Sequence, residues 1–377
     1  MQVDVVTPAE MENADRSHWQ DLQAAQAGLS SPFLSPSFVE VVGRTRADVR
    51  IAIISDGGAK GYFPFETNRN GHARALGMGL SDMQGIVAPD ALAIDAVDLL
   101  HACGLRSFTF DHLVAEQRAW VATGPATFAR DTSKVMDLRA GFDAYAVDRQ
   151  ANSKKLLQAT ARQMRKLARE HGPVRFVSHS SDHVALDRLL LWKSRQYIRT
   201  GRRDVFANPK TRTFVHDLLE VRDRAFTAPL SVLMAGDSMV AAHFGLRSHR
   251  TLAWWFPAYD PAFAVYSPGL MLCLEAARGL AGEGLSTLDL GKGDEPYKDR
   301  LCNAHIDVLT GSVATTRRTH TAMVLRRWPY EQAMATVLGS PKLRSATRAT
   351  LARVGAVRQK RFALRNETSS RERICVH

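Results

Sequence analysis

Residues 254–298 read WWFPAYDPAFAVYSPGLMLCLEAARGLAGEGLSTLDLGKGDEPYK. The aromatic run at the start predicts a strand that ends at Pro257. Ser267 and Pro268 are start signals for a helix, which the apolar residues after them continue. Ser286–Leu290 then predicts a second strand. The first turn of the helix exposes unpaired N–H groups and the positive end of the helix dipole, which suits a phosphate. The segment therefore predicts two strands joined by a helix with an anion-binding end.

Ionisable side chains crowd the loop after the second strand. Asp289, Lys292, Asp294, Tyr297 and Lys298 lie there among glycines. Loops at strand ends commonly carry catalytic or binding groups, and a lysine would lower the pKa of a neighbouring carboxylate. We interpret the loop as part of a functional site, with a salt-bridged surface loop as the alternative.

The rest of the chain predicts a mixed α/β protein. Expected strands are Val49–Ile54, Gly61–Glu66, Ser107–Phe110, Val174–Val177, Leu230–Ala235, Met239–Arg247 and Arg250–Phe256, and expected helices are Ala91–Ala102, Phe142–Gln150, Ser153–Glu170, Asp182–Arg199 and Thr211–Arg222. We predict two domains, residues 1–150 and 151–316, followed by a basic tail, residues 317–377, that is helical or partly disordered.

The positive charge is concentrated in that tail. The chain of 377 residues has a net charge of +12, and Arg317–His377 holds 14 basic and 3 acidic residues. The neutral body argues against stable DNA binding. The tail is either a solvated extension or a contact for an anionic partner, namely a lipid surface or a cyclic dinucleotide. Ser153–Glu170 is also basic, and we interpret its charged side as a solvated outer face, with phosphate or membrane binding as the alternative.

Cysteine usage and hydropathy point to the cytoplasm. The four cysteines form no C-x-x-C pair and no cluster with metal-ligand spacing, so we expect no metal. No run of about 18 apolar residues is present, and the first 20 residues are acidic rather than signal-like. We expect a cytoplasmic protein, or one peripheral to the inner face of the membrane.

Several motifs carry a resemblance to a known family. GRRDVF, VAAHFGLR, WWFPAYDP, YSPGL and LDLGKGDEPYK, together with SPFLSPSF, LSDMQG and FDHL, span roughly Ser31 to Gly311. They resemble the CelD/BcsL-type acetyltransferases of bacterial exopolysaccharide and cellulose biosynthesis, which are related to FemAB-like tandem GNAT proteins. The resemblance implies tandem GNAT-like domains with splayed β-sheets, acetyl-CoA or another acyl-CoA as cosubstrate, and direct acyl transfer in a ternary complex.

The resemblance also implies where acyl-CoA binds. Phe256, Pro257, Ser267, Gly269 and Leu270 would contact it. The chain departs from the general phosphate loop, Q/R-x-x-G-x-G/A, because Tyr266–Leu270 offers one glycine and a proline, which has no N–H.

Four residues are candidates for catalysis. Strand alternation places His243 opposite the apolar row of Met239–Arg247, so it is a candidate base, with a structural histidine as the alternative. Asp289 or Asp294 is the other candidate base, and Tyr297 the group that protonates the leaving thiolate.

Seven residues are candidates for the acceptor substrate. We expect a groove between the domains. Its predicted contacts are Asp82, Gln84, Asp111, His112, Trp255, Lys292 and Lys298. Capping of turns and strand ends is the alternative for the first four, and a place in the core is the alternative for Trp255.

Three functions fit these observations. The first is an N-acyltransferase that moves an acyl group from acyl-CoA to the amine of a sugar or exopolysaccharide precursor. The second is a FemAB-like transferase that uses aminoacyl-tRNA. The third is a binding protein with reduced catalysis that senses an anionic ligand such as cyclic di-GMP through the tail.

Overall fold

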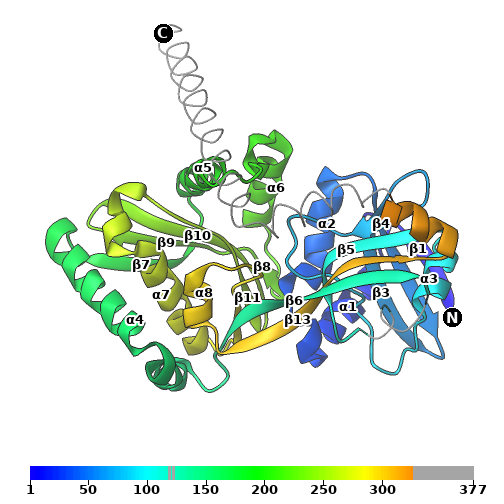
Figure 1. Cartoon of the computed structure of the whole chain (residues 1–377), viewed down its shortest axis with the longest axis horizontal. Coiled ribbons are helices and arrows are strands. Elements are labelled where there is room, and N and C mark those ends of the chain that lie inside the picture. Colours follow the sequence, from blue (N-terminus) through cyan, green and yellow to red (C-terminus); the bar gives the residue numbers. More distant parts are fainter. Residues whose placement is uncertain (118–119, 121–123, 326–377) are drawn as a thin grey trace, which may run out of the picture.

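One mixed sheet organises the molecule. The computed structural model describes residues 1–117, 120 and 124–325 (Figure 1). Within these residues thirteen strands form a single sheet that is mostly antiparallel, with helices on both faces. This confirms the predicted α/β class. The tail beyond residue 325, with the anionic partner predicted for it, lies outside the described residues.

The sheet consists of two halves with the same strand order. From the outer edge inward, the first half contains β1 (Gln2–Val6), β2 (Val49–Asp56), β3 (Ala59–Thr67), β4 (His72–Ala75), β5 (Ser107–Val114) and β13 (Ala304–Ala314). The second contains β7 (Val174–Ser180), β9 (Leu230–Ala235), β10 (Ser238–Ser248), β11 (Thr251–Tyr259), β12 (Thr287–Asp289) and β6 (Ala126–Asp137). β8 (Phe226–Thr227) pairs with β10 beside this path. Each half has one parallel pair, β4 with β5 and β11 with β12, at the same place in the order.

The innermost strands are exchanged between the halves. β13 comes last along the chain but pairs with β5 of the first half, and β6 follows the first-half strands but pairs with β12 of the second. β6 and β13 pair with each other at the centre of the sheet. Each half is therefore completed by a strand that lies next to the other half in sequence.

Helices cover the sheet on both sides (Figure 1). They are α1 (Asn13–Ala25), α2 (Pro36–Thr45), α3 (Ala96–Ala102), α4 (Phe142–His171), α5 (His183–Arg199), α6 (Pro209–Leu219), α7 (Pro268–Gly282) and α8 (Pro296–Leu301). Several begin at caps that the sequence supplies, such as Asp182, whose carboxylate accepts from the Val184 N–H before α5. In the described part of the chain no helix is long and apolar enough to cross a bilayer.

Alternate strand residues enter different cores. Ile51 and Ile53 of β2 join a core under α1, α2, α5 and α6 that runs across both halves. Ala52 and Ile54 face the opposite side and join a core under α3. In the second half, α4 and α7 cover a separate core on that opposite side. One face of the sheet therefore joins the two halves through a common core.

Several element boundaries differ from those predicted. Phe142–His171 is one helix, so Ser153 lies inside α4 rather than at its start, and the predicted boundary at residue 150 falls within this helix. β5 extends through Asp111 and His112, and β11 extends past Pro257 to Tyr259. α3 begins only at Ala96, because Asp95 caps it.

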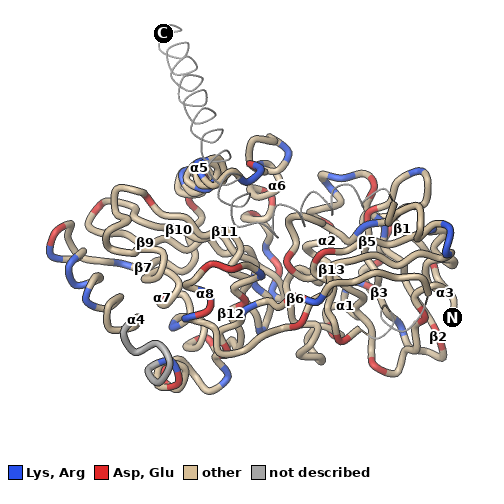
Figure 2. Tube along the Cα trace, in the orientation of Figure 1, with Lys and Arg blue, Asp and Glu red and all other residues tan. Residues whose placement is uncertain are grey.

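The basic helix has an exposed charged side. Basic positions run along α4 in Figure 2, and Arg162, Arg165, Lys166 and Arg169 are exposed. Leu167, on the other side of the helix, is buried in the core beneath α7. This exposure agrees with the interpretation of a solvated outer face.

Candidate functional site

The parallel pair of the second half opens into a cavity. β11 pairs with β12 only along Thr251–Ala253, although β11 continues to Tyr259. A cavity of about 840 Å³ lies beside the diverging part, between β11, α5 and the first turn of α7. The predicted strands are thus splayed beside the helix end.

Most of the predicted acyl-CoA contacts line this cavity. Pro257, Ser267, Gly269 and Leu270 are all in its wall. The Phe256 side chain is not among the lining residues and is buried in the core against Phe206.

Ser267 begins the helix in an unexpected way. Its φ of 57° and ψ of 49° are left-handed, and it is the one non-glycine residue with positive φ among those described. Its side chain forms no capping hydrogen bond with α7, contrary to the prediction. Such conformations cost energy and are concentrated at functional sites. The Ser267 hydroxyl and the first turn of α7 both border the cavity.

Basic side chains from α5 and the following loop form the opposite wall. Arg195, Arg199 and Arg202 line the cavity. Lys193 also lines it and donates a hydrogen bond from Nζ to the Pro257 carbonyl at 3.1 Å. Burial, with a contribution from the charge of Arg202, lowers the pKa of Lys193 to about 8. The sequence analysis missed Lys193, because a single lysine in an amphipathic helix carries no signal.

Tyr297 lies in the wall of the cavity, as predicted for a group near the thioester. Burial is the main cause that raises its pKa above the ordinary value, with smaller contributions from Cys273 and Glu295. The hydroxyl therefore stays protonated at neutral pH and is a hydrogen-bond donor.

The structure argues against His243 as the base. Its side chain is 0% exposed and stacks on Trp254, with ring centroids 3.7 Å apart. Its Nε2 accepts a hydrogen bond from the Trp255 backbone N–H at 3.2 Å. Burial lowers the pKa of His243 to about 3, so it is a weak base. Strand alternation alone does not make His243 accessible, because helices cover both faces of β10.

The two tryptophans are also assigned differently. Trp255, predicted to contact substrate, packs in the core against Phe33, and its indole N–H donates to the Leu80 carbonyl at 2.7 Å. Trp254 lines the cavity instead. It is the tryptophan available to a ligand.

A group of charged side chains joins the two halves beside the cavity. Asp82 and His112, from the first half, lie 3.8 Å apart, and His112 lies 3.1 Å from Asp111. Lys292 of the second half donates to the Asp111 carbonyl at 2.5 Å. Gln84 donates to the Asp111 carboxylate at 2.6 Å. The structure thus brings together the four first-half residues predicted to contact the acceptor, and Lys292 with them.

Asp82 has the properties of a general base. Burial raises its pKa to about 6; the charge of His112 opposes this and that of Asp289 adds to it. Its side chain is nevertheless 30% exposed, so a substrate can reach it. Its charge also acts on Lys193 and Tyr197, both in the cavity wall. A partly exposed carboxylate with a pKa near 6 is suited to proton transfer at neutral pH.

The carboxylate of Asp111 is held in its charged form. Burial alone would raise the pKa of Asp111, but hydrogen bonds from His112 and Gln84 and the charges of His112 and Lys292 together lower it. Two neighbouring carboxyl groups, Asp82 and Asp111, therefore have pKa values shifted in opposite directions. Such a separation is typical of sites where one carboxyl group takes up a proton and another stays ionised.

The loop after β12 supplies the remaining groups. Asp289 is buried and accepts from Ser133 Oγ at 2.5 Å and from the Gly291 N–H at 2.9 Å, while burial raises its pKa. Lys298 is buried and donates to the Lys292 carbonyl at 2.6 Å. We assign both residues to positioning of this loop.

Asp294 is placed apart from the other predicted groups. It is exposed, and its charge is not among those that act on Asp82. It is therefore a poor candidate for catalysis. Within the described residues no group of three or more His, Cys, Asp or Glu side chains is arranged to hold a metal.

The comparisons with known proteins agree with this geometry. Residues 154–299 match the family described as acetyltransferase (GNAT) domain. This stretch includes β11, α7, β12 and most of the cavity wall. The protein carries a GNAT domain and is an acyltransferase. Among curated proteins, none matches its sequence.

Solved structures share the fold of the whole described chain. A conserved protein of unknown function from Bacteroides thetaiotaomicron is 12% identical, with a TM-score of 0.55, and the match covers 83% of this chain and 100% of that one. FemX is 9% identical with a TM-score of 0.55, covering 86% and 99%. The C-terminal domain of a putative lysylphosphatidylglycerol synthetase from Agrobacterium fabrum is 12% identical with a TM-score of 0.53, covering 83% and 96%. At these identities the likeness shows the fold alone.

Proposed function

We propose that the protein transfers an acetyl or other acyl group from acyl-CoA to an amino group of a sugar or exopolysaccharide precursor. The observation that carries this proposal is the cavity in the splay of β11 and β12, which has the α7 helix end on one side and arginines on the other. A helix end and arginines suit the phosphates of CoA.

The proposed reaction is direct attack on the thioester. The amine nitrogen bonds to the acyl carbon, and the carbon–sulfur bond breaks. Asp82 takes the proton that the amine loses. Tyr297, whose hydroxyl stays protonated, donates a hydrogen bond to the leaving thiolate, and the proton that Asp82 took up passes through solvent to this thiolate, which restores Asp82. Tyr297 lines the cavity, and the charge of Asp82 acts on Tyr197 in the same wall.

Acyl-CoA binding can be tested with a matched pair of substitutions. Ala264 and Ala262 are both exposed in the turn Pro261–Tyr266, but only Ala264 lines the cavity. Acetyl-CoA should raise the Tm of the wild type and of Ala262→Trp, because a ligand at a hundred times its Kd stabilises the folded state by about 2.7 kcal/mol. Ala264→Trp should bind at least about tenfold more weakly. An unchanged Tm with acetyl-CoA in all three proteins would overturn the proposal.

A second candidate is an aminoacyl group carried on tRNA. Arg195, Arg199 and Arg202 on one cavity wall favour it, because they suit a phosphodiester backbone as well as CoA. The same Tm measurement separates the candidates. Stabilisation by aminoacyl-tRNA but not by acetyl-CoA, lost in Ala264→Trp, would select the second.

A further inference from the structure

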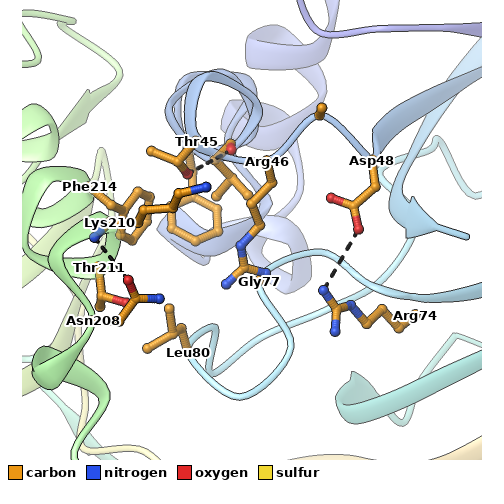
Figure 3. A pocket seen from close by; sticks show the side chains of 13 residues that line it. Thr45, Arg46, Asp48, Arg74, Gly77, Leu80, Asn208, Lys210, Thr211 and Phe214 are labelled. Atoms are coloured by element: carbon orange, nitrogen blue, oxygen red, sulfur yellow. Dashed lines mark hydrogen bonds and ion pairs between the residues drawn. The ribbon is translucent and has the colours of Figure 1, made fainter.

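A second cavity lies between the two halves, away from the proposed donor site. It has a volume of about 430 Å³ and lies between α2 of the first half and α6 of the second (Figure 3). Phe38, Val42, Leu80 and Phe214 give it apolar walls. The cavity is therefore formed only when both halves are in place.

A buried carboxylate fixes two arginines in its wall. Glu66 is 0% exposed and binds the Arg46 guanidinium, while Arg74 donates to it from Nε at 2.8 Å and from a terminal nitrogen at 2.5 Å. The Gly77 N–H also donates to Glu66, at 2.8 Å. These bonds use only part of the donors of each guanidinium. The remaining donors are held in place for a ligand.

A third cation gives the cavity an excess of positive charge. Figure 3 shows the Lys210 ammonium and the Arg46 guanidinium reaching into the same space. In the described part of the chain no hydrogen bond or ion pair engages the Lys210 ammonium. Asp48, which lies 3.8 Å from Arg74, is the other acidic group. Three cations thus face two carboxylates, one of them fully buried.

The cavity adjoins the proposed base. Leu80 lines it, and Asp82 follows two residues later, so their Cα atoms are at most about 7 Å apart. The Leu80 carbonyl is tied to Trp255 by the indole hydrogen bond. Gln84 donates to Ser81 Oγ at 3.1 Å. The segment between Leu80 and Asp82 is therefore held by hydrogen bonds at Leu80 and at Ser81.

We propose that this cavity binds the phosphate of the acceptor, which is an amino sugar phosphate ester whose amine reaches Asp82. The inference rests on the proposed function and adds to it the substrate class. Arg46, Arg74 and Lys210 bind the phosphate through charge-assisted hydrogen bonds. The apolar face of the sugar packs on Leu80. The donor and the acceptor then enter from different cavities and meet at Asp82.

The test compares one lysine and one arginine on the same helix. Lys210 and Arg212 are both exposed near the start of α6, but only Lys210 lines the cavity. The full chain should bind glucosamine 1-phosphate at least about tenfold more tightly than glucosamine, as measured by titration calorimetry. Lys210→Glu should remove this preference, and Arg212→Glu should keep it. Equal losses in the two variants would overturn the inference.

A further binding experiment distinguishes a soluble phosphate from one carried on a lipid. Phosphatidylcholine vesicles with and without a polyprenyl phosphate are tested beside the soluble sugar phosphate. Binding that depends on Lys210 supports the inference in either arm, and identifies a soluble or a lipid-linked acceptor. If neither the soluble sugar phosphate nor the vesicles show binding that depends on Lys210, the inference is wrong.

Acetyl-CoA titration of the same samples separates this inference from the proposed function. Lys210→Glu should leave acetyl-CoA affinity unchanged. Failure of acetyl-CoA to bind the wild type counts against the proposed function, whereas normal acetyl-CoA binding without a phosphate preference counts against the inference alone. An equal loss of acetyl-CoA affinity in Lys210→Glu would assign the cavity to the donor and overturn the inference.

Discussion

The two halves of the sheet share one strand order but differ in the gap beside their parallel pair. In the second half the gap between β11 and β12 is the 840 Å³ cavity. In the first half, residues 84–87 fill the corresponding gap: Gln84 forms a bridge with Leu113 of β5, and Val87 forms one with Tyr62 of β3. The same framework is therefore open where the acyl donor is proposed to bind and closed where it is not.

The segment that closes the first gap also serves the second half. Asp82 lies two residues before it and belongs to the charged group beside the cavity. The Gln84 side chain accepts hydrogen bonds from the N–H groups of Asp111 and His112, both at 3.0 Å. Closing one gap thus positions a carboxylate for the other. The first half thus supplies a carboxylate and the second half holds the cavity.

The largest expected effect is the loss of the base that the closed half contributes. Asp82→Asn should lower kcat/KM by roughly 10²- to 10⁴-fold, the usual contribution of general base catalysis. It should also abolish the acidic limb of the pH profile, which we expect at about pH 6 from the raised pKa of Asp82. The measurement is acyl transfer from acetyl-CoA across pH.

Asp294→Asn is the matched control for Asp82→Asn. Asp294 is exposed and is not in the cavity wall, so this variant should retain wild-type turnover. If Asp294→Asn lost activity and Asp82→Asn kept it, the division of roles between the two halves would be wrong.

A smaller effect is expected from opening the closed gap. Gln84 is buried, and its side chain satisfies two backbone N–H groups of β5. Gln84→Ala leaves them without partners and should lower the free energy of unfolding by roughly 2 to 4 kcal/mol. Denaturant titration measures this. Gln158→Ala, at an exposed position of α4, should change it by less than about 0.5 kcal/mol. Equal effects would show that the bridge does not hold the gap closed.

The smallest expected effect is the destabilisation of the folded state by the ionised Asp82 carboxylate. Its pKa rises on folding from 3.8 to about 6, so the folded state disfavours its ionised form. The penalty is absent below pH 3.8, where the carboxyl group is protonated in both states, and complete above about pH 6. Relative to wild type, Asp82→Asn should therefore gain stability as pH rises through this window, by on the order of 1 kcal/mol because solvent screens a partly exposed group. A Tm difference that stays constant with pH would contradict this.

Local sequence signals predicted the frame of the second half well. The expected strands Leu230–Ala235 and Met239–Arg247 correspond to β9 and β10, and Pro268 marks the start of α7. Ser267 and Gly269, at this helix start, line the cavity. These features depend on neighbouring residues, and for such features a single sequence carries the necessary information.

Other parts of the site depend on contacts between distant segments. Strand alternation assigned His243 to an accessible face, but α5 and α7 cover both faces of β10. A bulge between Phe244 and Leu246 shifts the register further. Asp82 and Asp289 were both candidates, yet only the pairing of the two halves brings their charges close enough to act on one another. Lys193 acquires its low pKa from burial that its own segment does not reveal.

The exchanged strands have a consequence for synthesis of the chain. β13 ends at Ala314, yet it pairs with β5, whose residues leave the ribosome about two hundred positions earlier. The first half cannot complete its sheet until nearly the whole described chain has emerged, and it must wait with the edge of β5 uncovered. Cutting the chain between the halves would remove a strand from each product. We therefore expect neither half to complete its sheet before β13 has emerged, and the two halves to unfold together.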